Sequence, residues 1–110
     1  MRRRVVLFLL LALSQGVIAR AEGLDDLKGQ DWIQMSLGQK QDFVYRGIGA
    51  LERQGVSLLK SPSYYIEALD KVLKIDEGLR EEYLDNLFVF CVHESEPHTR
   101  QALEKIRNSN

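Results

Sequence analysis

The chain has 110 residues and carries fifteen lysines and arginines against sixteen aspartates and glutamates. This length has room for one domain, and the single cysteine excludes a disulfide within the molecule. Once the basic leader described next is removed, eleven basic and sixteen acidic residues remain, and the resulting net charge of −5 disfavours binding to nucleic acid or to anionic lipid.

Residues 1–21 have the pattern of a secretory signal peptide. Arginines occupy positions 2–4, an apolar run covers positions 5–13, and the small residues Ala19 and Ala21 follow. This order of basic region, apolar region and A-x-A site predicts cleavage after Ala21. The apolar run is nine residues long, well short of the roughly twenty that a membrane-spanning helix needs. The sequence therefore predicts a periplasmic or secreted protein with no membrane attachment after cleavage.

The remaining chain divides into three parts. Residues 22–30 are polar and contain glycine, so we expect a flexible lead-in that joins the fold near Trp32. Residues 31–107 carry the apolar positions of a helical domain. Residues 108–110 are polar, and we expect them to form a disordered tail.

The first long helix is predicted to begin after Ser36. Gln39 stands three positions further on, which is the spacing of a capping box. Apolar residues then recur at helical intervals, and Gly55 suits the end of the helix. The apolar positions are Leu37, Val44, Ile48 and Leu51.

Two glycines, Gly47 and Gly49, lie inside this helix. Each costs about 1 kcal/mol relative to alanine. We therefore expect another backbone or a large side chain to pack closely against them, with Trp32 and Tyr65 as the candidate side chains.

Three more helices follow in the predicted order. Proline suits a first helical position and serine suits a cap, so Ser61-Pro62 or Ser63 indicates the start of a helix that ends near residue 75. A third helix over residues 79–92 is apolar on more than one side, which is typical of a central element. We expect a loop over residues 93–96 and a last helix from Pro97. No stretch alternates with a period of two, so the predicted fold is an all-α bundle of about four helices.

Four ionisable side chains near the C-terminus suggest a metal site: His93, Glu94, Glu96 and His98. The two histidines are five positions apart with a proline between them, whereas the helical zinc motif places them four apart on one face. A looser transition-metal site is one interpretation, because histidine is a versatile ligand. A solvated connection between two helices is the other.

Cys91 allows three interpretations. A nucleophilic cysteine needs a lowered pKa and an exposed position, and His93 is two residues away. Cys91 instead continues the apolar stripe of Leu84 and Leu87, which favours a buried, small hydrophobic side chain. An intermolecular disulfide is the third interpretation, because an unpaired cysteine in an exported chain can pair between molecules. We expect a monomer or a weak dimer.

Charged residues on the predicted helices need no function of their own. Asp70 and Lys74 are four positions apart, a spacing that stabilises an exposed helix by a few tenths of a kcal/mol. The acidic run between Asp76 and Asp85 is either a solvated helix face or a negative patch for a basic partner.

Two segments form a recognisable pattern: Trp32-x2-Met35-Ser36-x3-Lys40-x2-Phe43-Val44-x2-Gly47 and Tyr65-Ile66-x2-Leu69-Asp70. This pattern resembles one in short, exported bacterial proteins of mostly unassigned function. The pattern is more distantly similar to the Rap/Tai type of immunity protein. Those are small helical periplasmic proteins that bind and neutralise cell-wall-cutting toxins of the type VI secretion system. The resemblance implies a protein partner, although it assigns no toxin-binding residue and the paired cysteines common in that group are missing here.

The function predicted from the sequence is a non-enzymatic, exported protein-binding module without a cofactor, of the immunity type. Three aromatic residues, Trp32, Tyr45 and Tyr64, are the candidate anchors for the partner, because a few aromatic side chains supply most of the affinity of an interface. Core packing is the competing interpretation for Trp32. The alternative function is a small metal- or ligand-binding protein that uses His93 and His98.

Overall fold

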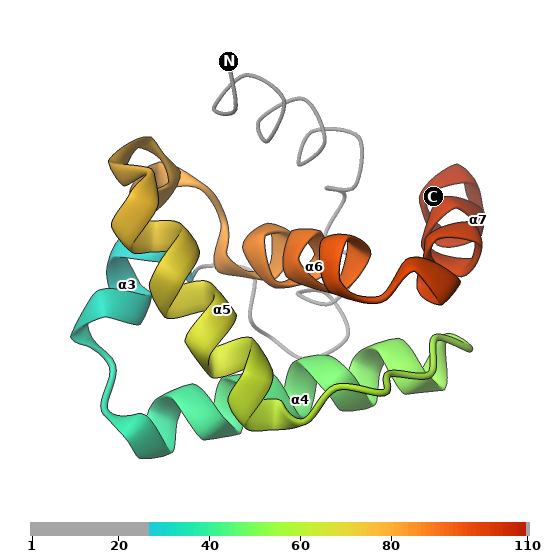
Figure 1. Ribbon diagram of the computed structural model, residues 1–110, viewed down its shortest axis with the longest axis horizontal. Coiled ribbons are helices and arrows are strands. Elements are labelled where there is room, and N and C mark those ends of the chain that lie inside the picture. The colour runs from blue at the N-terminus through green and yellow to red at the C-terminus, as the bar shows by residue number, and fades with distance from the viewer. Residues whose placement is uncertain (1–26, 110) are drawn as a thin grey trace.

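The computed structural model describes residues 27–109 (Figure 1). The elements follow in the order α3 (Gly29–Gln34), α4 (Leu37–Arg53), α5 (Pro62–Ile75), η1 (Glu77–Glu81), α6 (Leu84–Ser95), η2 (Pro97–Thr99) and α7 (Arg100–Ser109), where η1 and η2 are 3-10 helices. Within this range the only extended pairing is one isolated bridge. The predicted all-α fold is confirmed, with the short helix α3 added to the four expected helices.

Helix α4 begins and ends where the sequence predicts. Ser36 Oγ accepts a hydrogen bond from the Gln39 backbone N–H at 3.2 Å, and Gln39 Oε1 accepts one from the Ser36 N–H at 2.9 Å. The two bonds are the expected capping box. Gly55 follows the helix with a φ of +87°, a conformation that favours glycine.

Helix α5 also follows its prediction. Ser61 Oγ accepts from the Tyr64 backbone N–H, and Pro62 occupies the first helical position. The helix contacts both α4 and α6 and crosses between them in Figure 1. It therefore packs against both α4 and α6.

Helix α6 is the central element, as its sequence indicates, and an aromatic row passes through it. Phe88 of α6 meets Phe43 of α4 edge-on, with ring centres 6.1 Å apart, and meets Tyr65 of α5 at 5.3 Å. Phe43 meets Trp32 of α3 in turn, at 6.0 Å. All four rings are buried, so this row joins α3, α4, α5 and α6 into one core.

A close contact explains one of the two glycines inside α4. A Cβ atom on Gly47 would lie 2.9 Å from Cε2 of Phe88, so only a glycine lets the ring approach the helix. The expected close packing is present at this position, but Phe88 makes it, and the predicted candidates Trp32 and Tyr65 do not. A Cβ on Gly49 would meet only the Arg53 guanidinium, at 3.4 Å.

The predicted start of the third helix, at residue 79, was wrong. Residues 77–81 form the separate 3-10 helix η1, and α6 begins only at Leu84. The backbone between them pairs with the chain that leads into α3: the Gly29 N–H donates to the Glu82 carbonyl at 2.9 Å, and the Leu84 N–H to the Leu27 carbonyl at 2.8 Å. These bonds hold Tyr83 in an extended conformation, which ends any helix there.

Other boundaries differ by a few residues. Helix α3 begins at Gly29, inside the expected lead-in of residues 22–30. Helix α6 runs to Ser95, through most of the loop expected over residues 93–96, and η2 precedes the last helix. Helix α7 continues to Ser109, into the expected tail of residues 108–110. The predicted signal peptide lies outside the described residues, and none of the helices over residues 27–109 is long and apolar enough to span a membrane.

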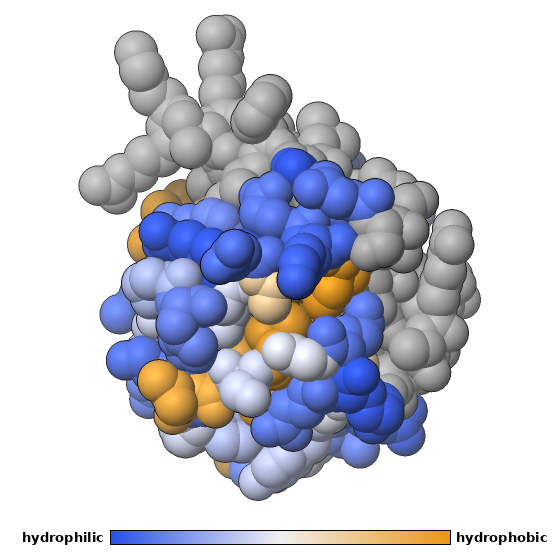
Figure 2. All heavy atoms as spheres, turned by 90° about the vertical axis from the view of Figure 1, so that its right-hand side faces the viewer, coloured by the Kyte–Doolittle hydropathy of each residue, from blue (hydrophilic) through white to orange (hydrophobic). Residues whose placement is uncertain are grey.

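The side of the molecule that carries α7 is mostly hydrophilic. Figure 2 views this side, which lies at the right in Figure 1 together with the connector between α4 and α5. Apolar atoms show in a hollow near the middle of this face. Within the connector, Val56 is buried but Leu59 is 81% exposed, so only part of it folds back over the core.

Candidate functional site

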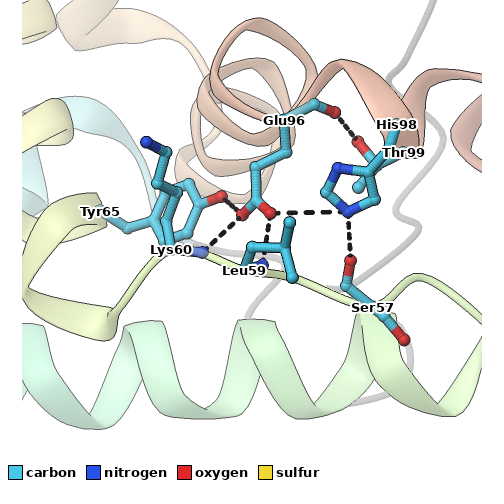
Figure 3. Close-up of polar contacts among 7 residues, drawn as sticks. All are labelled: Ser57, Leu59, Lys60, Tyr65, Glu96, His98 and Thr99. Atoms are coloured by element: carbon cyan, nitrogen blue, oxygen red, sulfur yellow. Dashed lines mark hydrogen bonds and ion pairs between the residues drawn. The ribbon is translucent and has the colours of Figure 1, made fainter.

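Glu96, a predicted metal ligand, is a buried structural residue. Its side chain is only 1% exposed. The carboxylate accepts hydrogen bonds from the backbone N–H groups of Leu59 and Lys60 and from the hydroxyl of Tyr65 (Figure 3). Its own carbonyl accepts the Thr99 hydroxyl at 2.7 Å. Glu96 therefore ties the connector and α5 to the start of η2.

The environment of Glu96 keeps Tyr65 in its neutral form. Burial raises the pKa of the Tyr65 phenol far above its ordinary value, and the hydrogen bond to the Glu96 carboxylate raises it further. The phenol can therefore donate its proton to the hydrogen bond over the whole physiological pH range.

The two histidines lie in different local environments. His93 is hydrogen-bonded through Nδ1 to Glu94 Oε2 at 3.0 Å. His98 donates from Nε2 to the Ser57 carbonyl at 2.9 Å, and this nitrogen is 3.7 Å from Glu96 Oε1. Among residues 27–109, no three histidine, cysteine, aspartate or glutamate side chains converge in a way that could hold a metal ion. The four predicted ligands thus form two separate pairs, His93 with Glu94 and His98 with Glu96.

Cys91 is buried in the core, as its place in the apolar stripe indicates. Burial raises the pKa of its thiol to about 12, with a smaller contribution from the nearby charge of Glu94. The thiolate is the nucleophilic form of cysteine, and this environment disfavours it. The interpretation of Cys91 as a small hydrophobic residue is confirmed.

The three candidate anchors lie in different environments. Trp32 is only 1% exposed, so it completes the core and offers a partner little surface. Tyr64 is half-buried, with its hydroxyl bonded to Ser95 at 2.8 Å and its ring beneath the Lys60 ammonium. Tyr45 is 62% exposed on α4. Of the three, Tyr45 alone presents most of its side chain to solvent.

A polar cluster that the sequence did not predict surrounds the indole nitrogen of Trp32. Trp32 Nε1 donates to Asp70 Oδ1 at 2.7 Å, and the Lys40 ammonium contacts the same oxygen at 2.9 Å. The ammonium also lies 5.1 Å from the centre of the Trp32 ring, within the range of a cation–π interaction. The cluster joins α3, α4 and α5.

A pocket of about 230 Å³ opens beside this cluster. The residues around it are Trp32, Ile33, Lys40, Asp70, Leu73, Lys74 and Arg80. Three of these side chains are cationic and one is anionic, so the pocket is locally positive in a chain that is acidic overall.

The pattern that carries the resemblance already contained the residues of this cluster. Trp32, Lys40 and Asp70 are all in it, although the sequence assigned Asp70 to a helical pair with Lys74. Asp70 lies 38 positions after Trp32 and 30 positions after Lys40, and only the fold brings these side chains into contact. The spacing of residues within one helix therefore gave no signal for the cluster.

Comparison of the chain with models of known protein families, with curated proteins and with solved structures finds no match.

Proposed function

We propose that the protein is a non-enzymatic, exported protein-binding module. Its predicted signal peptide supports the site of action, and its acidic charge suits electrostatic steering of a basic partner. In the form suggested by the resemblance to the Rap/Tai type, the module neutralises a cell-wall-cutting toxin by covering its active site.

A row of exposed side chains on the outer side of α4 is the observation that carries the proposal. Leu37 and Tyr45 are each 62% exposed there. With the exposed Gln41 between them they stand at intervals of four, so they form one row along the helix surface. An ion pair between Asp42 and Arg46, at 3.2 Å, lies beside the row. Apolar and aromatic side chains with a charged rim are the usual composition of a protein interface.

The chemistry of the other candidate residues supports a non-enzymatic role. Burial holds Cys91 as a thiol, which is a poor nucleophile. The carboxylate of Glu96 is occupied by backbone donors and Tyr65. The alternative, a metal- or ligand-binding protein that uses His93 and His98, has less support because their side chains contact different groups.

Affinity purification tests the proposal. Tagged protein beginning at residue 22 is incubated with the exported proteins of the cell of origin, and the bound proteins are identified. We expect one specific partner that the variant Tyr45→Ala fails to retain. Tyr83→Ala is the matched control, because Tyr83 is also an exposed tyrosine but lies at the start of α6. Equal recovery by both variants would contradict the assignment to α4.

A metal assay tests the alternative directly. If the purified protein retains zinc or copper stoichiometrically, and replacement of His93 and His98 by alanine releases it, the metal-binding function replaces the proposed one.

A further inference from the structure

We propose that the pocket beside Trp32 binds a carboxylate group carried on a short apolar stem. This inference concerns a different surface from the outer side of α4 and does not depend on the proposed function. It rests on the charges around the pocket, on its size and on the apolar residues at its base.

The charges favour a single negative group. Lys40, Lys74 and Arg80 face one carboxylate, that of Asp70. Lys40 gives one of its three N–H donors to Asp70 and is only 18% exposed, so its ammonium is held in place. Among the described residues no carboxylate pairs with Lys74, and Arg80 meets Glu77 only at 4.0 Å. Lys74, and Arg80 on release of its long contact with Glu77, can therefore turn toward an anion.

The carboxylate of Asp70 offsets part of the positive charge around the pocket. Asp70 is fixed there by Trp32 and Lys40, so any anion that enters lies near its negative charge. Attraction by the cations and repulsion from Asp70 both grow with the charge of the ligand. The choice of a carboxylate over a phosphate dianion therefore rests on the apolar residues that line the pocket.

The size and base of the pocket define the rest of the ligand. A volume of about 230 Å³ is below the roughly 300–1,000 Å³ of pockets for drug-sized molecules, so it has room for a short chain of atoms. Leu73 and the ring of Trp32 are buried at its base, and the partly exposed Ile33 lies at its edge. These apolar surfaces suit a stem of two or three methylene groups, as in a free short-chain acid or a glutamate side chain.

Trp32 is the only tryptophan in the chain, so its fluorescence reports binding directly. We would titrate the protein with butyrate at constant ionic strength, with butyramide and with phosphate as comparisons. A capped peptide with one central glutamate, and its glutamine counterpart, separate a protein-borne carboxylate from a free acid. We expect saturable changes with butyrate or with the glutamate peptide, at dissociation constants of the order of millimolar.

Matched variants locate the site. Lys74→Gln and Arg80→Gln should each weaken binding by about tenfold, the effect of one hydrogen bond to a charged group. Lys71→Gln removes the same charge from α5 at a position outside the pocket and should change affinity by less than about twofold. Circular dichroism checks that all three variants keep the fold.

Each outcome decides the inference. Tighter binding of the peptide than of butyrate assigns the pocket to a protein ligand, and the reverse assigns it to a free acid. Three results would overturn the inference: responses to butyrate that match those to butyramide, tighter binding of phosphate than of either carboxylate, and equal losses in Lys71→Gln and Lys74→Gln.

Discussion

The hydroxyl of Tyr65 on α5 donates a hydrogen bond to the carboxylate of Glu96, thirty-one residues later at the end of α6. The same carboxylate accepts the backbone N–H groups of Leu59 and Lys60 in the connector. One buried side chain therefore joins the connector and α5 to the end of α6, more than thirty residues later. An unsatisfied buried donor costs more than an ordinary hydrogen bond contributes, so the charge of Glu96 is expected to matter for folding.

We predict that Glu96→Gln destabilises the fold by about 1–3 kcal/mol, the usual cost of leaving buried polar groups unpaired. The amide keeps the shape of the side chain, but its NH2 group cannot accept from a backbone N–H. Urea unfolding should show a lower midpoint with an unchanged slope. Glu94→Gln is the control, because this substitution removes the same charge two residues away, at an exposed position. Equal midpoints for the two variants would show that the Glu96 contacts contribute little.

The two glycines of α4 give a second, paired prediction. Gly49→Ala should stabilise the protein by up to about 1 kcal/mol, because alanine favours the helix and the site has room. Gly47→Ala should instead destabilise it by about 1–3 kcal/mol, because the new methyl group would press on the Phe88 ring. Thermal unfolding of both variants measures the difference. A gain in stability at both positions would mean that Phe88 moves away without cost.

Local signals predicted α4 and α5 almost to the residue, because Ser36, Gln39 and Pro62 act on atoms within one helical turn. The start of α6 could not be predicted in this way. This start depends on backbone pairing between residues 27–29 and 82–84. The residues next to position 83 in the sequence give no signal for that pairing.

For the candidate sites too, features set by nearby residues could be predicted and contacts between distant residues could not. The burial of Cys91 was predicted because the apolar stripe of its own helix contains the information. Glu96 looks like a loop residue in the sequence, yet the fold buries it against a connector 36 and 37 residues earlier. The contact of Trp32 with Asp70 also spans two helices, so spacing within either helix could not reveal it.

Cys91 should make the stability of the protein fall at alkaline pH. The pKa of the thiol is about 12 in the folded protein, against 9.0 for a free thiol. A group whose folded pKa is raised contributes stability that is complete below the unfolded pKa and is lost as the pH rises toward the folded value. The loss therefore begins near pH 9 and is on the order of 1 kcal/mol by pH 10.

Urea unfolding under reducing conditions at pH 8 and pH 10 measures this loss. Between the two pH values the wild-type protein should lose more stability than Cys91→Ala, by an amount on the order of 1 kcal/mol, because the variant lacks the thiol. The tyrosines are common to both proteins and cancel in the comparison. The same pH dependence in both proteins would indicate an exposed thiol and reopen the redox interpretation.

Export gives a fourth prediction, which rests on the sequence. We expect the protein recovered from outside the cytoplasm to begin at Glu22, because the basic region, the apolar run and the A-x-A site agree on cleavage after Ala21. Mass spectrometry of the intact protein from the periplasmic fraction checks this. Recovery of the uncleaved chain from a membrane fraction would argue against export as a free protein.

Electrostatic steering of the partner has its own test. The net charge of −5 that we expect after signal cleavage would favour a basic partner, and salt screens such long-range attraction within about 10 Å at 0.1 M. We therefore expect added salt to slow association, while the dissociation rate changes less. Stopped-flow measurements at several salt concentrations provide both rates. An association rate independent of salt would remove the role of the acidic surface.

We propose that the outer side of α4 binds a protein partner, and the affinity of the purified partner for α4 variants tests this role most directly. Calorimetric titration should show that Tyr45→Ala and Leu37→Ala each weaken binding by about fivefold or more, the scale at which an interface anchor is recognised. Tyr83→Ala should bind like the wild-type protein. Unchanged affinity in both α4 variants, with the fold intact, would contradict a role of α4 in partner binding.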